Sequence, residues 1–153
     1  MTYIHAIAIT GAGVVTGLLF AFSNFVMQAL AKLPNEHGMH AMREINEKII
    51  NPIFVLFFLL TPLLCVVLGI NAIINPEAGA AVFSVCGSVL YLAGPFGITM
   101  LFNVPLNNRL AKAAVEEADT LWPDYQVRWQ RWNHIRTCLG IVSIFLLVLG
   151  VAA

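Results

Sequence analysis

Four apolar stretches constrain the fold of this chain more than any other feature of its sequence. Each is long enough to cross about 30 Å of bilayer hydrocarbon, which takes roughly 20 helical residues. They are Ile4–Leu30, Ile53–Ile74, Ala80–Phe102 and Ile135–Ala152. Hydrophobic residues make up 59% of the 153-residue chain and charged residues only 10%, and a water-soluble domain of this size cannot bury so much apolar surface. We predict one all-α domain, residues 1–153, that forms an integral membrane four-helix bundle in the lipid bilayer.

The positive charges predict how the bundle is oriented. All eight Lys and Arg residues fall between the first and second stretches, between the third and fourth, or at the foot of the fourth. Cytoplasmic loops of membrane proteins carry such an excess. We therefore expect residues 31–52 and 103–134 to be cytoplasmic and both termini to lie on the non-cytoplasmic side. Because Pro is favoured in a first helical turn, we also expect a break near Pro105 and an interfacial helical segment between the third and fourth spans.

The sharpest pattern lies just before the fourth stretch. Five residues recur there at spacings of 3, 4, 3 and 4, which places them on one face of a helix: Trp122, Tyr125, Trp129, Trp132 and Arg136. Asn133 lies at the edge of this face, and His134 falls on the other side. The same face continues upward through Gly140 and Ser143, and small-residue faces of membrane helices pack inward. We expect the aromatic face to form one wall of a pocket.

An aromatic belt at the membrane surface is the alternative interpretation of these tryptophans, because Trp is enriched at both interfaces. Belt tryptophans normally occur on several helices, whereas all three Trp of this chain precede one helix. The belt explains only part of the pattern, and both interpretations remain open from the sequence alone.

Polar residues on the other helices are further candidates for the pocket. They are Asn24, Arg43, Asn46, Asn103 and Asn107. Asn24 is costly in lipid and is expected to point into the bundle, either toward a ligand or in an interhelical hydrogen bond that only holds the helices together. Asn103 has a comparable alternative, because Asn suits the capping position of a new helix.

Gly13 and Gly17 form a GxxxG pattern in the first stretch. Small residues at this spacing let two membrane helices approach closely. The contact lies either inside one bundle or between two copies of the chain, so a homo-oligomer through the Gly13/Gly17 face is one expectation.

Other kinds of site have weaker support. Residue types that ligate metals occur on the charged side, at His37, His40, Glu44 and His134, but no spaced motif brings them together. The presence of a metal or other cofactor therefore stays open. Basic residues alternate with acidic and aromatic ones and form no patch of the kind that nucleic acid requires, so we expect no nucleic-acid partner.

Amides, indoles and an arginine beside an apolar interior suit an apolar, aromatic small molecule that arrives from the bilayer with one polar edge. Indole faces stack on aromatic rings, and Asn and Arg donate hydrogen bonds to a carbonyl or phenolate. Such donors stabilise an enolate-like anion as it forms. A non-catalytic protein that binds a lipid or quinone, or that scaffolds a partner, would use the same residue types and remains the alternative.

Four segments together resemble the anthrone oxygenase-like family of small four-helix membrane proteins, many bacterial members of which are classed as a domain of unknown function. They are GLLFAFSNFVMQALAKLP (17–34), MREINEKIINPIF (42–54), NVPLNNRLA (103–111) and WPDYQVRWQRWNHIRT (122–137). The resemblance covers nearly the whole chain, and the combination of NxPLN with WxxWNHxRT is specific. It implies an integral protein of the bacterial inner (plasma) membrane.

Fungal members of that family oxidise anthrones to anthraquinones with dioxygen. The resemblance therefore implies an oxidoreductase of the oxygenase type, with an anthrone-, phenol- or quinol-like substrate, dioxygen as co-substrate and no further cofactor required by the sequence. The residues it favours for catalysis are His134 as base, directly or through a water, and Asn103, Asn107, Asn133 and Arg136 as donors to an oxyanion. The helix faces described above add the candidates for substrate contact: Trp129, Trp132, Tyr125, Arg43, Asn46 and Asn24. Gln28, Arg43 and Glu44 depart from the family pattern, which leaves the pocket shape and the substrate open.

Overall fold

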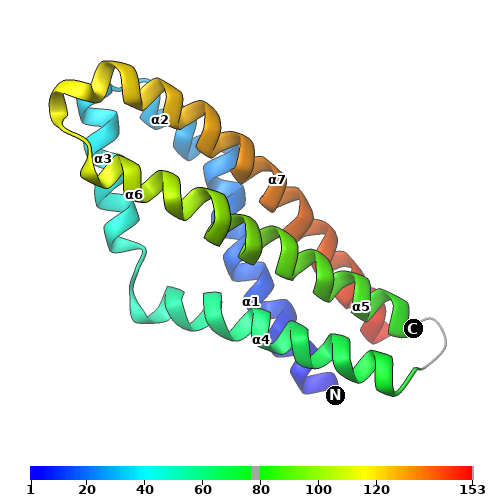
Figure 1. Ribbon diagram of the computed structural model, residues 1–153. Coiled ribbons are helices and arrows are strands. Elements are labelled where there is room, and N and C mark those ends of the chain that lie inside the picture. The colour runs from blue at the N-terminus through cyan, green and yellow to red at the C-terminus, as the bar shows by residue number, and fades with distance from the viewer. Residues whose placement is uncertain (77–79, 153) are drawn as a thin grey trace.

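The computed structural model describes residues 1–76 and 80–152, which form an all-helical bundle (Figure 1). Four of its helical stretches are long and apolar enough to cross a membrane: Thr2–Leu30, Pro52–Ile74, Ala80–Lys112 and Val115–Ala152. Each contains one of the four spans predicted from the sequence. The prediction of an all-α membrane bundle is therefore confirmed, and the chain is an integral membrane protein.

Several spans are composite helices. In chain order the elements are α1 (Thr2–Ala21), η1 (Phe22–Val26), α2 (Met27–Leu30), α3 (Asn35–Lys48), α4 (Pro52–Ile74), α5 (Ala80–Tyr91), η2 (Leu92–Asn103), α6 (Val104–Lys112), η3 (Val115–Glu117) and α7 (Ala118–Ala152). The first and third spans each contain a π-helical segment, η1 and η2, where the backbone winds more widely. Such segments occur often at functional sites.

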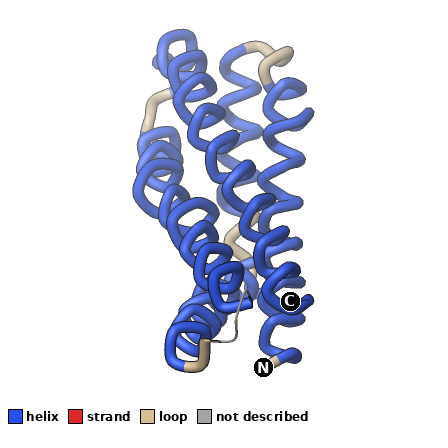
Figure 2. The backbone as a smooth tube through the Cα atoms, turned by 90° about the vertical axis from the view of Figure 1, so that its right-hand side faces the viewer, coloured by secondary structure: helices blue, strands red, loops and turns tan. Residues whose placement is uncertain are grey.

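The longest helix, α7, is longer than a membrane is thick. α7 has 35 residues, a length of about 52 Å, which exceeds the thickness of bilayer hydrocarbon. Its first half lies with α3 and α6 at what we call the charged end. Figure 1 shows the N-terminus and the last turns of α7 at the opposite end, and the same arrangement is visible in the turned view of Figure 2.

The expected break near Pro105 is wrong, because the third span runs without interruption from η2 into α6. The expected helical segment is present: α6 begins at Val104 with Pro105 in its first turn, and it continues the same helix. The backbone N–H of Val104 bonds to the carbonyl of Thr99, five residues earlier. This wide turn accommodates Pro105, which has no N–H to contribute.

The chain does break between α3 and α4. The side chain of Asn51 accepts a hydrogen bond of 3.1 Å from the backbone N–H of Phe54, and Pro52 occupies the first helical position. An Asn cap followed by Pro is a strong helix start, because it satisfies one exposed donor and removes another. α4 therefore runs in a different direction from α3. Of the polar residues of α3, Asn46 lines the cavity described below.

The helices pack through small residues at the end opposite the charged end. The hydroxyl of Ser143 in α7 donates to the carbonyl of Gly87 in α5 at 2.7 Å. A Cβ atom at Gly140 would lie 2.5 Å from Oγ1 of Thr16 in α1, so the backbone of α7 packs directly against the Thr16 side chain there. The small-residue face of α7 thus packs inward, as its sequence pattern predicted.

The glycine pattern of α1 has a different orientation. Gly13 and Gly17 are exposed, and a Cβ atom at either would meet nothing within 4 Å. Asn24, on the same face, is also exposed, so the expectation that it points into the bundle is wrong. The reason is that the opposite face of α1, with Val15 and Leu19, buries larger apolar side chains against α4 and α7.

Candidate functional site

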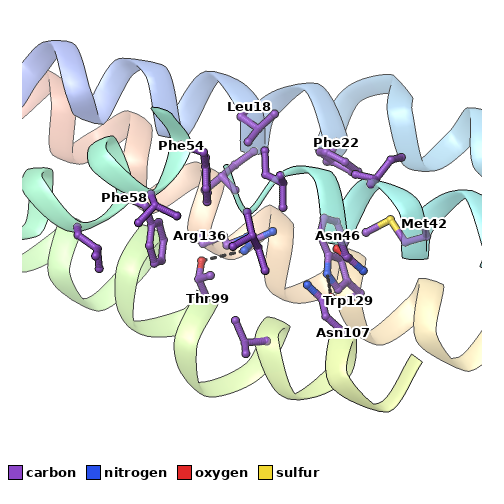
Figure 3. Close-up of a pocket in the computed structure, with 17 residues that line it drawn as sticks. Leu18, Phe22, Met42, Asn46, Phe54, Phe58, Thr99, Asn107, Trp129 and Arg136 are labelled. Carbon is purple, nitrogen blue, oxygen red and sulfur yellow. Dashed lines mark hydrogen bonds between the residues drawn. The ribbon is translucent and has the colours of Figure 1, made fainter. Parts of the chain in front are cut away.

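A cavity of about 300 Å³ lies inside the bundle toward the charged end (Figure 3). Every long element contributes to its wall except α5. The lining residues are Leu18, Leu19, Phe22, Met42, Ile45, Asn46, Ile49, Ile50, Phe54, Val55, Phe58, Leu59, Thr99, Val104, Asn107, Trp129 and Arg136. Its volume is at the lower end of the range for small-molecule sites, and its wall is largely apolar with a few polar groups, which is typical of such sites.

The cavity exists because the first turns of α4 do not pack into the bundle. The first fully buried residues of α4 are Thr61 and Pro62, more than two turns into the helix. Before them, Phe54 and Phe58 turn toward the cavity and stack on each other, with ring centroids 5.5 Å apart. Leu59, on the cavity rim, is 55% exposed, so the opening faces the apolar surface of the protein.

Arg136 is the polar centre of the cavity. Its side chain is 5% exposed, and its guanidinium carbon lies 4.9 Å from the centre of the Trp129 ring. The Nε and Nη2 groups donate to Oδ1 of Asn133 at 3.0 and 2.7 Å, and Nη1 donates to the hydroxyl of Thr99 at 2.8 Å. Among the described residues no carboxylate forms an ion pair with it. Arg136 is therefore a buried positive charge without a counterion from the residues that the structure describes.

Asn133 holds Arg136 in place. Its Oδ1 accepts both guanidinium bonds, while its Nδ2 donates to the carbonyl of Leu19 at 2.9 Å and to the hydroxyl of Ser23 at 2.7 Å. All the hydrogen-bonding groups of this amide are thus directed at protein atoms, and its exposure is 0%. Asn133 does not line the cavity, and its contacts fix the orientation of a side chain that does.

A second network orients Asn107. Its Oδ1 accepts hydrogen bonds from the hydroxyl of Tyr125 at 2.8 Å and from Nε1 of Trp129 at 2.9 Å, and Asn46 donates to the same hydroxyl at 3.5 Å. An indole N–H can only donate, so the oxygen of the Asn107 amide must face Trp129. The Nδ2 group is thereby left as a donor on the cavity side, as the view in Figure 3 shows.

Asn103 joins two helices. It is 1% exposed and donates from Nδ2 to the backbone carbonyl of Trp129 at 3.2 Å, while its Oδ1 has no partner. It makes no side-chain capping bond for α6. The structure thus places Asn103 between the end of η2 and α7, behind the cavity wall.

Trp132 lies on the flank of α7 rather than on the inward face predicted for it. Its ring stacks on Phe102 with centroids 3.9 Å apart and an interplanar angle of 13°, and it lines a shallow outer depression with Arg109 and Arg128. Trp122 and Trp129, in contrast, are 1% and 3% exposed. Trp129 therefore lines the cavity, as the pocket-wall interpretation predicted, whereas Trp132 lies on the outside of the bundle.

Several other candidates lie away from the cavity. The guanidinium of Arg43 donates to the backbone carbonyls of Leu110 and Ala113, which ties α3 to the end of α6 and satisfies terminal carbonyls. His134 is exposed on α7, on the side opposite Arg136, as the helical spacing indicated. The possible metal ligands His37, His40 and Glu44 are also exposed on α3. Within residues 1–76 and 80–152, no three or more His, Cys, Asp or Glu side chains are grouped so that they could hold a metal ion.

Sequence reasoning missed the apolar wall on α4. Phe54 and Phe58 are one helical turn apart, but in a membrane span nearly every residue is apolar, so composition alone does not distinguish a cavity wall from a lipid-facing surface. The available signal was the Asn51–Pro52 helix start, which indicates that the first turns of α4 diverge from α3. Thr99 was also missed as a residue of the cavity wall. Its hydroxyl donates to the Pro95 carbonyl and accepts from Arg136. The available signal was its position one helical turn after Pro95.

Comparison with known proteins gives one match. A protein-family model described as anthrone oxygenase matches residues 48–146, which is 99 of the 153 residues of the chain. The matched region includes the α4, η2, α6 and α7 walls of the cavity and ends beyond Arg136. No curated protein and no solved structure matches the chain.

Proposed function

The chain belongs to the anthrone oxygenase family, and from this premise we propose that it is a membrane-embedded oxygenase whose substrate is an apolar aromatic molecule of the anthrone, phenol or quinol type. The substrate occupies the cavity around Arg136, at the cytoplasmic membrane interface. Dioxygen is the co-substrate.

The observation that carries this proposal is the buried charge of Arg136 at the polar end of an apolar cavity. Burying a guanidinium without a carboxylate partner is costly, and such groups in membrane proteins are typically functional. A ligand with flat apolar rings and one anionic oxygen matches both parts of the wall. Its rings would lie against Phe54 and Phe58, and its oxygen would accept hydrogen bonds from Arg136 and Asn107.

The oxidation of an anthrone shows how this arrangement would act. Loss of a proton from the CH₂ group gives an enolate, whose negative charge is mostly on the oxygen that faces Arg136 and Asn107. The enolate carbon then forms a bond to dioxygen, and the resulting peroxide anion takes up a proton. Loss of water from this hydroperoxide leaves a C=O group, so one oxygen atom enters the product and the other leaves as water. The protein contributes by stabilising the anion with preorganised donors.

His134 takes no direct part in this scheme. A general base must come within hydrogen-bonding distance of the proton it removes, or act through one water. His134 is exposed on the side of α7 opposite the cavity. Substitution of His134 by Ala is therefore expected to leave turnover unchanged.

Oxygen uptake by purified protein in lipid nanodiscs tests the proposed function. With a hydroxyanthrone as substrate, we expect dioxygen consumption and the appearance of the anthraquinone absorbance at a one-to-one ratio. The Arg136→Gln variant should lose about 100-fold in kcat/KM, a typical effect of removing one oxyanion donor. Arg131→Gln is the matched control, because Arg131 is exposed on the same helix. Binding without any oxygen uptake by the wild-type protein would support the non-catalytic binding protein instead.

A further inference from the structure

The cavity wall contains one ionisable side chain, Arg136, and no group that could act as a base. Of its 17 lining residues, those from α1, η1 and α4 are all apolar, and the polar ones besides Arg136 are Asn46, Thr99, Asn107 and Trp129. Tyr125 does not line the cavity, and its hydroxyl group donates to Oδ1 of Asn107. A ligand in this cavity therefore meets donors from three helices and no proton acceptor with a negative charge.

The carboxylates that the structure describes all lie elsewhere. Six of the seven are exposed: Glu36, Glu44, Glu47, Glu116, Glu117 and Asp119. The seventh, Asp124, forms ion pairs with Arg128 at 3.0 Å and Arg109 at 3.7 Å on the outside of α7. The other cation near the cavity, Arg43, is turned to backbone carbonyls of the α6 end. The field inside the cavity is therefore set by Arg136.

Arg136 and Asn107 keep donors available for a ligand. A guanidinium has five N–H groups, and three of those of Arg136 are bonded to Asn133 and Thr99, which leaves one on each of Nη1 and Nη2. Tyr125 and Trp129 both donate to the oxygen of the Asn107 amide, so its Nδ2 group remains available as a donor to a ligand in the same cavity. Three nitrogen donors thus remain on the wall of this cavity, and two of them belong to the positively charged guanidinium.

We propose that this cavity binds its ligand as a monoanion, a phenolate or an enolate, and that the ligand ionises because Arg136 and Asn107 stabilise the anion rather than because a side chain removes the proton. The O–H or C–H bond of the ligand breaks with its electron pair remaining on the ligand, and water at the charged end takes the proton. This inference deepens the proposed function. It rests on that function in one respect: both take this cavity as the site where the ligand binds.

A coloured phenol that cannot be oxidised tests the inference separately from turnover. 2-Hydroxyanthraquinone already has its central carbonyls, and its phenol and phenolate forms absorb at different wavelengths. Titrated in nanodiscs of zwitterionic phosphatidylcholine, the protein-bound probe should ionise about 1–2 pH units lower than the probe in empty nanodiscs, the size expected for a nearby opposite charge. Arg131→Gln should retain this shift, and Arg136→Gln should abolish it.

The Asn107→Asp variant gives an independent test. It keeps the oxygen that Tyr125 and Trp129 contact and replaces only the Nδ2 donor with a negative oxygen, so the bound probe should ionise at a higher pH than in the wild-type protein. This variant still tests the inference if Arg136→Gln fails to fold, and size-exclusion chromatography would show such a failure.

The outcomes separate the two proposals. A lowered ionisation pH without oxygen uptake from the hydroxyanthrone supports the anion site and overturns the oxygenase. Oxygen uptake by a protein that binds the probe without lowering its ionisation pH overturns the anion inference and leaves the oxygenase standing. Absence of probe binding, or a shift that persists in Arg136→Gln, overturns the inference as well.

Discussion

The two tryptophans of the WxxW pattern, Trp129 and Trp132, have different surroundings although they lie on one helix three residues apart. Trp129 donates to Asn107 and carries the guanidinium of Arg136 on its face, whereas Trp132 stacks on Phe102 outside the cavity. Helical spacing places Trp132 and Asn133 on the two flanks of the face that Trp129 and Arg136 occupy. Which flank turns inward depends on the packing partner, so spacing alone could not show that Trp132, which was expected on the inward face, lies outside and Asn133 inside.

This difference predicts unequal effects of two matched substitutions. Trp129→Phe removes the hydrogen bond to Asn107 and weakens the contact with Arg136, so it should raise the Kd for 2-hydroxyanthraquinone about tenfold. Trp132→Phe keeps an aromatic ring against Phe102 and should change that Kd less than twofold. Titration of the probe absorbance in nanodiscs measures both values. Equal losses in the two variants would contradict the assignment of Trp129 alone to the cavity.

Loss of the Asn133 side chain is expected to destabilise the folded protein. Asn133→Ala leaves two guanidinium donors of Arg136, the hydroxyl of Ser23 and the carbonyl of Leu19 without this partner, at a cost of about 2–3 kcal/mol in the free energy of unfolding. Asn24→Ala is the matched control, because that amide is exposed, and it should change stability by less than about 0.5 kcal/mol. Denaturant unfolding in detergent micelles compares the two. A similar small change in both would show that the Asn133 network contributes little.

The four spans could be predicted at the scale of whole elements because hydropathy over about 20 residues records burial in lipid directly. Breaks within and between helices were less predictable. The expected break at Pro105 did not occur because the π-helical end of η2 accommodates a residue without an N–H. The start of α4 was readable from Asn51 and Pro52, and it is the feature that opens the cavity. Side-chain direction within the spans was not readable, since Phe54 and its lipid-facing neighbours are equally apolar.

Contact between helices predicts opposite effects at two glycines. Gly140→Ala places a Cβ atom 2.5 Å from the Thr16 hydroxyl and 3.0 Å from Pro95, so α1 and η2 must move away from α7, at a cost of about 1–3 kcal/mol. Gly13→Ala meets no atom within 4 Å and should stabilise the isolated bundle by up to about 1 kcal/mol through helix propensity. The melting temperatures of the two variants in the same detergent provide the measurement. A stable Gly140→Ala protein would mean that α1 and α7 are less closely packed than described.

At the scale of the whole molecule, the distribution of charge predicts the orientation in the membrane. The eight Lys and Arg residues lie from Lys32 to Lys48 and from Arg109 to Arg136, at the end of the bundle that holds the cavity. Alkaline phosphatase is active only outside the cytoplasm, so a fusion after Ala152 should be active and a fusion after Lys48 inactive. The reverse pattern would place the cavity at the outer surface and contradict a cytoplasmic site.

The unpacked first turns of α4 have a consequence for how substrate concentration must be expressed. The cavity rim at Ile50 and Leu59 faces the apolar surface, so an apolar ligand reaches the cavity from the lipid phase. Occupancy then depends on the mole fraction of ligand in the bilayer rather than on its total concentration. Adding protein-free vesicles at constant total ligand dilutes the ligand in two dimensions. An apparent KM quoted per volume of sample will rise in proportion to the amount of lipid, while the same data plotted against mole fraction will fall on one curve.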